Sequence, residues 1–196
     1  MAKILVACEY SGTVRDAFAK EGHSVVSCDL LPTESPGLHY QGDVLDLQNE
    51  EFDLVIAHPP CTHLAISGAR WFKDKEVEQK EALEFFKIFL NWNAQYICVE
   101  NPISIVSSRI RKPNQIIQPW MFGHSVSKST CLWTKNLPLL QPTNVVDKGD
   151  FVTFKSGKRM PAWYNISPSN DRWKQRSKTF PGIAEAMAKQ WGPLLD

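Results

Sequence analysis

Apolar residues follow two periodicities along the first half of the chain. Short apolar runs with the length of buried strands occupy residues 3–8, 24–30, 53–57 and 95–100. Between the first two runs, Val14, Ala17 and Phe18 recur on one face of a predicted helix, which ends at Gly22. This order of strand, helix and strand predicts an α/β fold that opens with a parallel sheet of the nucleotide-binding type.

A second amphipathic helix is predicted over residues 74–93, directly before the last of these runs. Its apolar residues recur at helical spacing among charged ones. The residues expected to turn inward include Val77, Leu83, Phe86 and Leu90.

Prolines divide the second half of the chain into shorter elements. Strands are predicted over residues 128–134 and 151–154, and Ser156-Gly157 is expected to form a turn after the second of them. A last helix is predicted over residues 181–191, with Ile183, Met187 and Trp191 on one side. Because the chain has 196 residues, we expect residues 1–196 to form a single domain.

Composition narrows the classes of function. Lys and Arg number 22 and Asp and Glu number 21, so nucleic acid would have to be bound by a local basic patch. The five cysteines are odd in number and lack CxxC spacing, which argues against a disulfide framework or a zinc ribbon. No apolar run approaches the roughly 18 residues of a membrane span, and residues 1–8 do not resemble a signal peptide. We expect a cytoplasmic protein with no membrane partner.

Cys61 is the first candidate for chemistry. It follows the predicted strand at residues 53–57, on a loop stiffened by Pro59 and Pro60. Enzymes with α/β folds carry their chemistry at the carboxyl ends of strands. Glu100 ends the next predicted strand, so the thiol and this carboxylate are expected to face one crevice.

A nucleophilic Cys61 needs a pKa below the value of about 8.5 that is usual for a free thiol. The candidate cations for lowering this pKa are Arg70, Arg109, Arg111 and Lys128. Burial as a structural residue is the alternative for Cys61, and its pairing with Glu100 favours the nucleophile. His58 and His63 flank Cys61, but ligands so close together, with two prolines between them, are poorly placed for one metal centre, and we expect none.

Acidic residues follow the first strands of the predicted sheet. Asp29 ends the strand at residues 24–30, and Asp43 follows Gly42. Such carboxylates suit the ribose hydroxyls and the adenine amino group of an adenosine-containing cofactor. The loop at Ser11 and Gly12 has one glycine where a pyrophosphate site has three, which disfavours a dinucleotide and a nicotinamide-dependent dehydrogenase. The alternative is a tight turn with two solvated acids.

Basic and aromatic residues are interleaved near the carboxyl terminus. They are Arg159, Trp163, Tyr164, Arg172, Trp173, Lys174, Arg176 and Lys178. Such a stretch is suited to contact phosphates and to stack on a base, and the alternative is a solvated face anchored by aromatic residues.

These residues, taken in order, resemble the motifs of the cytosine carbon-5 DNA methyltransferases, which use S-adenosylmethionine. The matching segments are Cys8-Glu-Tyr-Ser-Gly12, Asp29, Gly42-Asp43, Pro60-Cys61, Glu100-Asn101 and residues 174–191. The resemblance implies a Rossmann-like methyltransferase fold, with a mostly parallel sheet flanked by helices and a carboxyl-terminal helix that returns to the sheet.

The resemblance also implies a role for each matched residue. Cys61 would add to carbon 6 of cytosine, while Glu100 would support protonation of ring nitrogen 3. Lys128 would replace a family arginine at the pyrimidine carbonyl. The cofactor would be held by Glu9, Ser11, Gly12, Asp29, Asp43 and Pro59, and the substrate by Pro60, Asn101, Arg159 and Arg176.

The chain departs from the family's pattern in three respects. Thr62 stands where the family has glutamine, Pro102 stands where it has valine, and residues 140–173 leave no room for the domain that reads DNA sequence. The hypotheses are therefore carbon-5 methylation of cytosine in DNA, the same chemistry on a free cytosine nucleotide or single-stranded nucleic acid, and a catalytically silent cofactor-binding or nucleic-acid-binding module. A protein partner or oligomerisation could supply the missing recognition surface.

Overall fold

The computed structural model describes residues 1–67, 74–167, 169 and 172–195. Its strands are β1 (Lys3–Ala7), β2 (Ser24–Asp29), β3 (His39–Gln41), β4 (Phe52–Ala57), β5 (Ala94–Pro102), β6 (Gln115–Ile117), β7 (Thr130–Lys135), β8 (Phe151–Thr153) and β9 (Arg159–Pro161). Its helices are α1 (Thr13–Lys20), α2 (Glu76–Leu90), α3 (Val106–Arg109), α4 (Arg172–Ser177) and α5 (Pro181–Trp191). Short 3-10 turns are η1 (Val44–Leu47), η3 (Pro119–Met121), η4 (Ala162–Asn165) and η5 (Gly192–Leu194).

The main sheet that the described residues form has seven strands, in the order β3-β2-β1-β4-β5-β7-β6. The first five of these run parallel, and β7 is antiparallel to both of its neighbours. The chain moves outward from β1 to β3 and then returns to β4 on the other side of β1. The strand order therefore reverses between β1 and β4, and open α/β sheets bind their ligands at the carboxyl ends of the strands at such a point.

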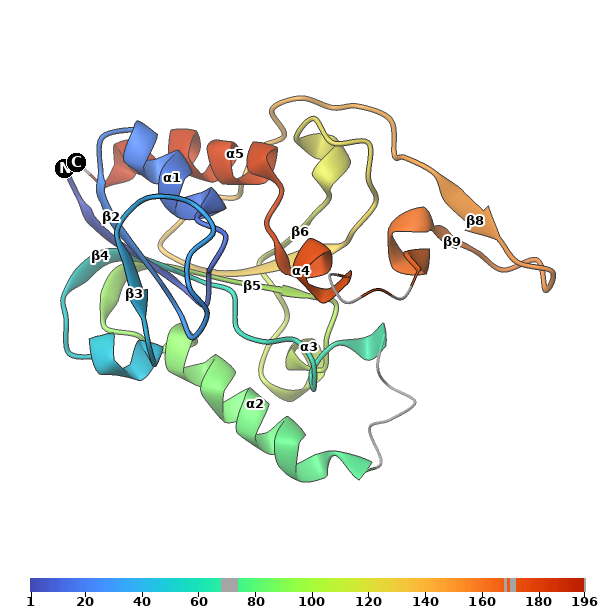
Figure 1. Cartoon of the computed structure of the whole chain (residues 1–196), viewed down its shortest axis with the longest axis horizontal. Coiled ribbons are helices and arrows are strands. Elements are labelled where there is room, and N and C mark those ends of the chain that lie inside the picture. The colour runs from blue at the N-terminus through green and yellow to red at the C-terminus, as the bar shows by residue number, and fades with distance from the viewer. Residues whose placement is uncertain (68–73, 168, 170–171, 196) are drawn as a thin grey trace.

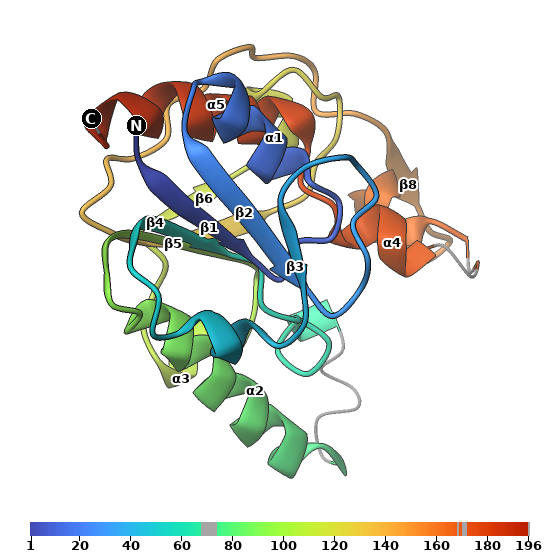
Figure 2. The same ribbon diagram turned by 60° about the vertical axis from the view of Figure 1, so that its left-hand side comes forward.

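Helices cover both faces of the sheet. Figure 1 shows α1 and α5 on one face and α2 and α3 on the other, and the turned view in Figure 2 agrees. On α5, Ile183 is 2% exposed and Met187 and Trp191 are 0% exposed, because this side of the helix packs against α1 and the sheet. The predicted mostly parallel sheet and the helix that returns to it are confirmed.

The sequence pattern was wrong or silent at a few positions. Val77 is 68% exposed although helical spacing predicted it to face the core, whereas Phe86 on the same helix is fully buried. Figures 1 and 2 show that the amino-terminal end of α2 extends away from the sheet, so among the described residues its first turn lies outside the core. The pattern did not predict β3 or β6, which are only 3 residues long each.

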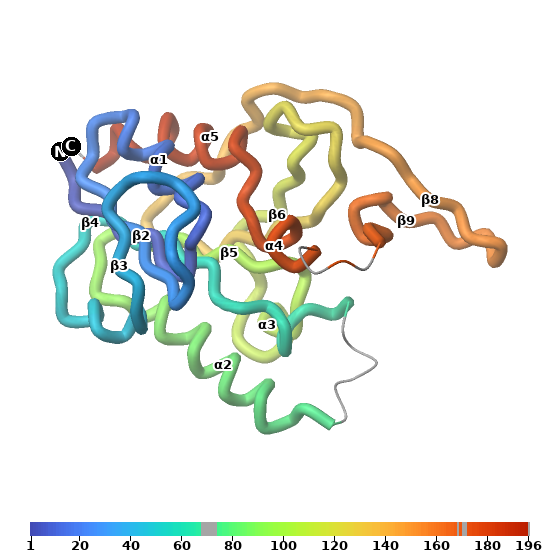
Figure 3. Tube along the Cα trace, viewed as in Figure 1, coloured from blue at the N-terminus to red at the C-terminus, as the bar shows by residue number. Residues whose placement is uncertain are grey.

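A separate two-stranded sheet of β8 and β9 projects from the body, as the tube in Figure 3 shows. The predicted turn at Ser156-Gly157 joins these strands, and Gly157 has a φ of 79°. Among the described residues, no helix has the length and apolar character needed to cross a lipid bilayer.

We expect Met187→Ala to lower the free energy of unfolding by about 2–5 kcal/mol, because it leaves a cavity where the side chain is now fully buried. Urea denaturation followed by circular dichroism measures this. Lys189→Ala, on the exposed side of the same helix, is the control and should change the free energy by less than about 0.5 kcal/mol. Equal effects of the two substitutions would contradict the packing of α5.

Candidate active site

Two residues of the loop between β1 and α1 have a left-handed backbone conformation. Cys8 has a φ of 58° directly after β1, and Gly12 has a φ of 74° directly before α1. A Cβ atom on Gly12 would clash with the Ser35 hydroxyl and the Arg15 guanidinium. Glycine is therefore required here both by the backbone conformation and by the close approach of the β2–β3 connection.

Glu9 caps the amino terminus of α1 from within this loop. Its buried carboxylate accepts hydrogen bonds from the backbone N–H groups of Val14 at 2.7 Å and Arg15 at 3.2 Å. The Ser11 hydroxyl donates to the same carboxylate at 3.3 Å. Free N–H groups at a helix amino terminus attract phosphate, and here a negative charge already occupies them. The geometry thus disfavours a pyrophosphate, in agreement with the single glycine of the loop.

Arg15 ties the connection between β2 and β3 to α1. Its guanidinium is 1% exposed and donates to the Ser27 hydroxyl, the Thr33 hydroxyl and both oxygens of Ser35. Its Nε donates to Asp16 at 2.8 Å. A guanidinium with its donors paired in this way holds in place a connection that has no helix of its own. The sequence pattern does not predict this role for Arg15, because arginine on a helix is normally exposed.

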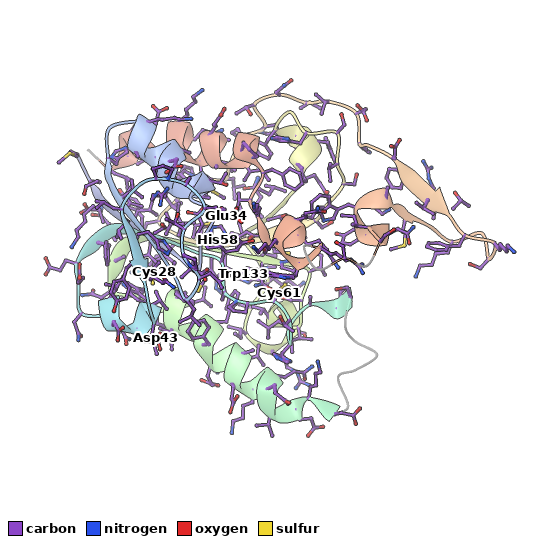
Figure 4. The ribbon with its side chains drawn as sticks, in the orientation of Figure 1. Cys28, Glu34, Asp43, His58, Cys61 and Trp133 are labelled. Carbon is purple, nitrogen blue, oxygen red and sulfur yellow. The ribbon has the colours of Figure 1, made fainter. Side chains whose placement is uncertain are left out.

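Asp29 and Asp43 lie near the end of β1. Each carboxylate accepts one backbone N–H bond, from Leu31 and Leu45 respectively, at 3.0 Å. Burial raises the pKa of the Cys8 thiol, and the negative charges of Asp29 and Asp43 raise it further, which reports that both acids are close to it. Figure 4 shows Asp43 on the β3 side of the sheet, and His58 and Cys61 nearer to α4. The edge of the sheet formed by the carboxyl ends of its parallel strands therefore has an acidic half, with Asp29 and Asp43, and a half that holds the Cys61 thiol.

The backbone around Cys61 is fixed by hydrogen bonds. Asn101 at the end of β5 is 1% exposed and donates from Nδ2 to the Pro59 carbonyl at 2.8 Å. The Cys61 carbonyl accepts from the N–H groups of Leu64 at 3.0 Å and Ala65 at 2.9 Å, so the chain turns directly after the cysteine. Asn101, predicted to bind substrate, thus positions the loop that carries Cys61.

The surroundings of Cys61 favour the neutral thiol. Burial raises the pKa of Cys61, the charge of Glu100 raises it further, and Lys128 and Arg176 lower it without reversing the direction. The lowered pKa that a resting thiolate needs is therefore not produced. Of the other cations considered from the sequence, Arg111 donates to Asn114 at 2.8 Å, and Arg70 lies outside the described residues.

His58 forms a buried pair with Glu100. The register of β4 and β5 aligns Ala57 with Val99, so the next residues of the two strands are side by side. His58 Nδ1 lies 3.1 Å from Glu100 Oε2, and the two side chains are 8% and 13% exposed. Because an ionised carboxylate only accepts hydrogen bonds, Nδ1 carries the proton.

This pair keeps Glu100 ionised at neutral pH. Burial by itself would raise the pKa of Glu100, but the hydrogen bond from His58 and the charge of Lys128 hold it below its ordinary value. From the sequence, His58 was a candidate only for a metal site. Its position at the end of one strand, beside Glu100 at the end of the next, was the signal that could have identified the pair.

Lys128 and Arg176 connect this centre to α4. Lys128 Nζ donates to the Arg176 carbonyl at 3.1 Å and lies 5.8 Å and 5.9 Å from the ring centroids of Trp163 and Phe180. On the other side of α4, the hydroxyls of Tyr10 and Ser177 share a hydrogen bond of 2.9 Å. The helix is thus held between the acidic half of the edge and the centre that contains Cys61.

The structure does not bring every predicted site residue to this centre. Arg159 is exposed on β9, with its guanidinium 4.5 Å from the centroid of the Phe151 ring. The hairpin that carries it projects away from the sheet in Figure 3. Pro59 is buried beneath the loop, whereas Pro60 is exposed on it.

No protein-family model matches the chain, and neither does any curated protein. Among solved structures, a protein named as a DNA modification methyltransferase, encoded within an Escherichia coli prophage, matches with a TM-score of 0.51 and 13% identity. The match covers 75% of this chain and 52% of that one, so the chain spans about half of that protein's length. This likeness shows the fold, and the expected Rossmann-like methyltransferase fold is confirmed.

Two other solved structures overlap less closely with the chain. A mutant of Spodoptera frugiperda DNMT2 gives a TM-score of 0.47 at 15% identity, covering 75% of this chain and 55% of that one. An rRNA methylase from Escherichia coli gives 0.40 at 12% identity, covering 69% and 58%.

We expect alkylation of Cys61 by iodoacetamide to be slow at pH 7 and to accelerate only above the ordinary pKa of a thiol, because burial and the charge of Glu100 raise the pKa of Cys61. Glu100→Gln should accelerate it several-fold at a given pH, since the substitution removes a negative charge that disfavours the thiolate. Lys128→Ala should slow it for the opposite reason. Mass spectrometry of the peptide that contains Cys61 follows the reaction, with urea-unfolded protein as the control. Equal rates for the wild type and Glu100→Gln would show that the carboxylate does not act on the thiol.

Proposed function

We propose that the protein transfers a methyl group from S-adenosylmethionine to carbon 5 of a cytosine in DNA, through a transient covalent bond to Cys61. The observation that carries the proposal is the grouping of Cys61, Glu100 and Lys128 at one strand edge, beside the acids that follow β2 and β3. The fold shared with a DNA modification methyltransferase supports the class of reaction.

The acidic half of the edge suits S-adenosylmethionine. Asp29 would bind the ribose hydroxyls and Asp43 the adenine amino group, since each carboxylate engages a single backbone N–H through one oxygen. This cofactor has no phosphate, and the Glu9 carboxylate occupies the place that a pyrophosphate would take. Gly12 allows the loop its close approach, and Pro59 lies at the boundary with the thiol. When bound, the cofactor supplies an electrophilic methyl group on a positively charged sulfur.

Cys61 and Glu100 would together activate the pyrimidine. The thiolate forms a bond to carbon 6 while ring nitrogen 3 takes a proton from Glu100, and the electrons of the carbon 5–carbon 6 double bond become available at carbon 5. Carbon 5 then takes the methyl group. Loss of the carbon-5 proton to a base, departure of the thiolate from carbon 6 and return of the nitrogen 3 proton to Glu100 restore the aromatic ring. Lys128 is suited to stabilise negative charge at the pyrimidine carbonyl.

The resting protonation states make one internal proton transfer necessary. Cys61 rests as a thiol and Glu100 as a carboxylate, whereas the reaction needs a thiolate and a carboxylic acid. A single proton moved from Cys61 to Glu100 satisfies both requirements without an external acid or base. His58 holds the carboxylate in position during this transfer, through the proton on Nδ1.

We propose an unpaired cytosine as the preferred acceptor. Between β7 and α4, the described residues form only the small β8–β9 hairpin and η4 as regular structure, which is little surface with which to read a duplex. The net charge of +1 provides no extended basic field. Extruding a base from a duplex costs a few kcal/mol, and a single strand avoids that cost.

Reaction with methyl-labelled S-adenosylmethionine should yield labelled 5-methylcytosine, with more from single-stranded DNA than from duplex DNA or cytidine monophosphate. Nucleoside digestion and mass spectrometry measure the product. Cys61→Ala should reduce the yield by at least about 1000-fold, because the bond to carbon 6 cannot form. Cys98→Ala, which removes a buried thiol elsewhere in the sheet, is the matched control and should remain active. Full activity of Cys61→Ala would exclude the covalent mechanism, and cofactor binding without product from any acceptor would favour a silent binding module.

We expect His58→Phe to lower kcat by about tenfold to a hundredfold with little change in KM. The pKa of Glu100 should rise, since its burial persists while the hydrogen bond that lowers this pKa is lost. Below that pKa the protonated Glu100 cannot accept the proton of Cys61, so the acidic limb of the rate profile should move to higher pH. Steady-state rates between pH 4 and pH 8 test this, and His63→Ala is the control that should leave the limb in place. An unmoved limb in His58→Phe would rule out this role of His58.

A further inference from the structure

A hollow lies between the segment before β7, which carries Lys128, and the β8–β9 hairpin. Its volume is about 280 Å³, close to the lower end of the range for small-molecule pockets. The residues around it that matter here are Gln118, Trp120, Ser129, Lys148, Phe151 and Tyr164. We call it the hairpin cavity.

The hairpin cavity shares a wall with the candidate active site. Ser127 and Ser129 line it, whereas Lys128 between them contacts the carbonyl of Arg176 and acts on Glu100. Neighbouring side chains of an extended segment point to opposite sides, which accounts for this division. Trp163 and Tyr164, which lie in η4, also face different sides of this wall. Lys128 lies over the ring of Trp163, whereas Tyr164 lines the cavity.

Polar groups on this wall have unused hydrogen-bonding capacity. Gln118 donates from Nε2 to the Ser129 hydroxyl at 2.9 Å, and its Oε1 is buried without a partner among the described residues. If the amide were turned over, its nitrogen would be the unpartnered atom instead. The Tyr164 hydroxyl accepts from the Ser129 N–H at 3.3 Å, and its own proton has no acceptor among the described residues. A buried polar atom without a partner is costly, so the Gln118 amide indicates a ligand that pairs with it, and the half-buried Tyr164 hydroxyl offers that ligand a second hydrogen bond.

The remaining walls are aromatic and cationic. Trp120, Phe151 and Tyr164 present flat apolar surfaces, and the exposed Lys148 has its Nζ 5.4 Å from the centroid of the Trp120 ring. Aromatic faces stack on bases in a sequence-tolerant way, and a nearby lysine neutralises phosphate. A planar ring with a hydrogen-bonding edge and an attached phosphate fits this combination.

We propose that the hairpin cavity binds the nucleobase that neighbours the target cytosine in a single-stranded acceptor, with Lys148 on the connecting phosphate. That the adjacent nucleotide is a cytosine to be methylated rests on the proposed function, whereas the binding of a base in the cavity does not. Only a single strand supplies such a base readily, since a base stacked in a duplex cannot enter.

The test is the affinity for labelled single-stranded oligonucleotides with one central cytosine, measured by fluorescence anisotropy. The nucleotide on either side of the cytosine is intact or abasic. Loss of the base on one side should weaken binding about tenfold, and its loss on the other side should have little effect. Phe151→Ala and Tyr164→Phe should each weaken binding of the intact strand but not of the abasic strand. Phe154→Ala, in the same hairpin and 38% exposed, is the control and should behave as the wild type.

Several outcomes would overturn the inference. These are equal affinities for intact and abasic strands, equal losses in Phe151→Ala and Phe154→Ala, no binding of any strand, or competition by deoxycytidine monophosphate as strong as by the oligonucleotide. Anisotropy and product formation also separate this inference from the proposed function. Base-dependent binding without 5-methylcytosine would support the hairpin cavity and contradict methyl transfer. 5-Methylcytosine formed from strands that bind equally with and without the neighbouring base would do the reverse.

Discussion

The parallel pairing of β4 with β5 is the constraint on which the candidate site depends. Its register aligns Ala57 with Val99, and the polar residues that follow are therefore held against one another where the strands end. His58, after β4, forms a hydrogen bond with Glu100 on β5, and Asn101 on β5 donates to the carbonyl of Pro59, after β4. These two contacts hold the ends of the two strands together. The loop with Cys61 inherits its position from these bonds. A shift of one residue in the register would turn Glu100 to the opposite face of the sheet and separate it from His58.

Charge divides the same edge of the sheet into two halves with different chemical uses. Glu9, Asp29 and Asp43 make the half near β1 acidic, which suits a positively charged cofactor and repels phosphate. Lys128 and Arg176 lie in the other half and act on Cys61, which suits an anionic acceptor. Helix α4 spans the two halves, since it contacts Tyr10 at one side and Lys128 at the other. A donor and an acceptor of opposite charge could thus approach one centre from different directions.

The site rests in the opposite protonation state to the one that the proposed chemistry needs. Burial and Glu100 keep the Cys61 thiol neutral, while His58 and Lys128 keep Glu100 ionised. A neutral thiol is protected from adventitious alkylation and oxidation, because the thiolate is the reactive form. The hairpin cavity lies on the far side of the Lys128 segment, so a strand bound there would reach the centre beside the same lysine. Substrate binding and activation would then share one stretch of chain.

Features that depend on neighbours along the chain could be predicted from the amino-acid pattern. Periodicity located β1, β2, β4, β5, α1 and α5, and turn chemistry located Gly12 and Gly157. The strand ends also indicated that Cys61 and Glu100 would lie near one another, because this follows from the order of parallel strands alone. Short strands such as β3, with 3 residues, carry too few positions for a periodic pattern.

The partners of the site residues and their charge states depend on the three-dimensional fold. Arg15 became a buried tie for a distant loop, and His58 found Glu100 at a separation of 42 positions. Arg159 and Arg176 belong to the same basic stretch of sequence, yet the projecting hairpin that carries Arg159 keeps it away from Cys61. The direction in which the pKa of Cys61 is shifted likewise could not be predicted from the sequence. Burial and electrostatic interaction depend on which groups meet in space, and the pattern of a single segment contains no information about groups that the fold brings from elsewhere.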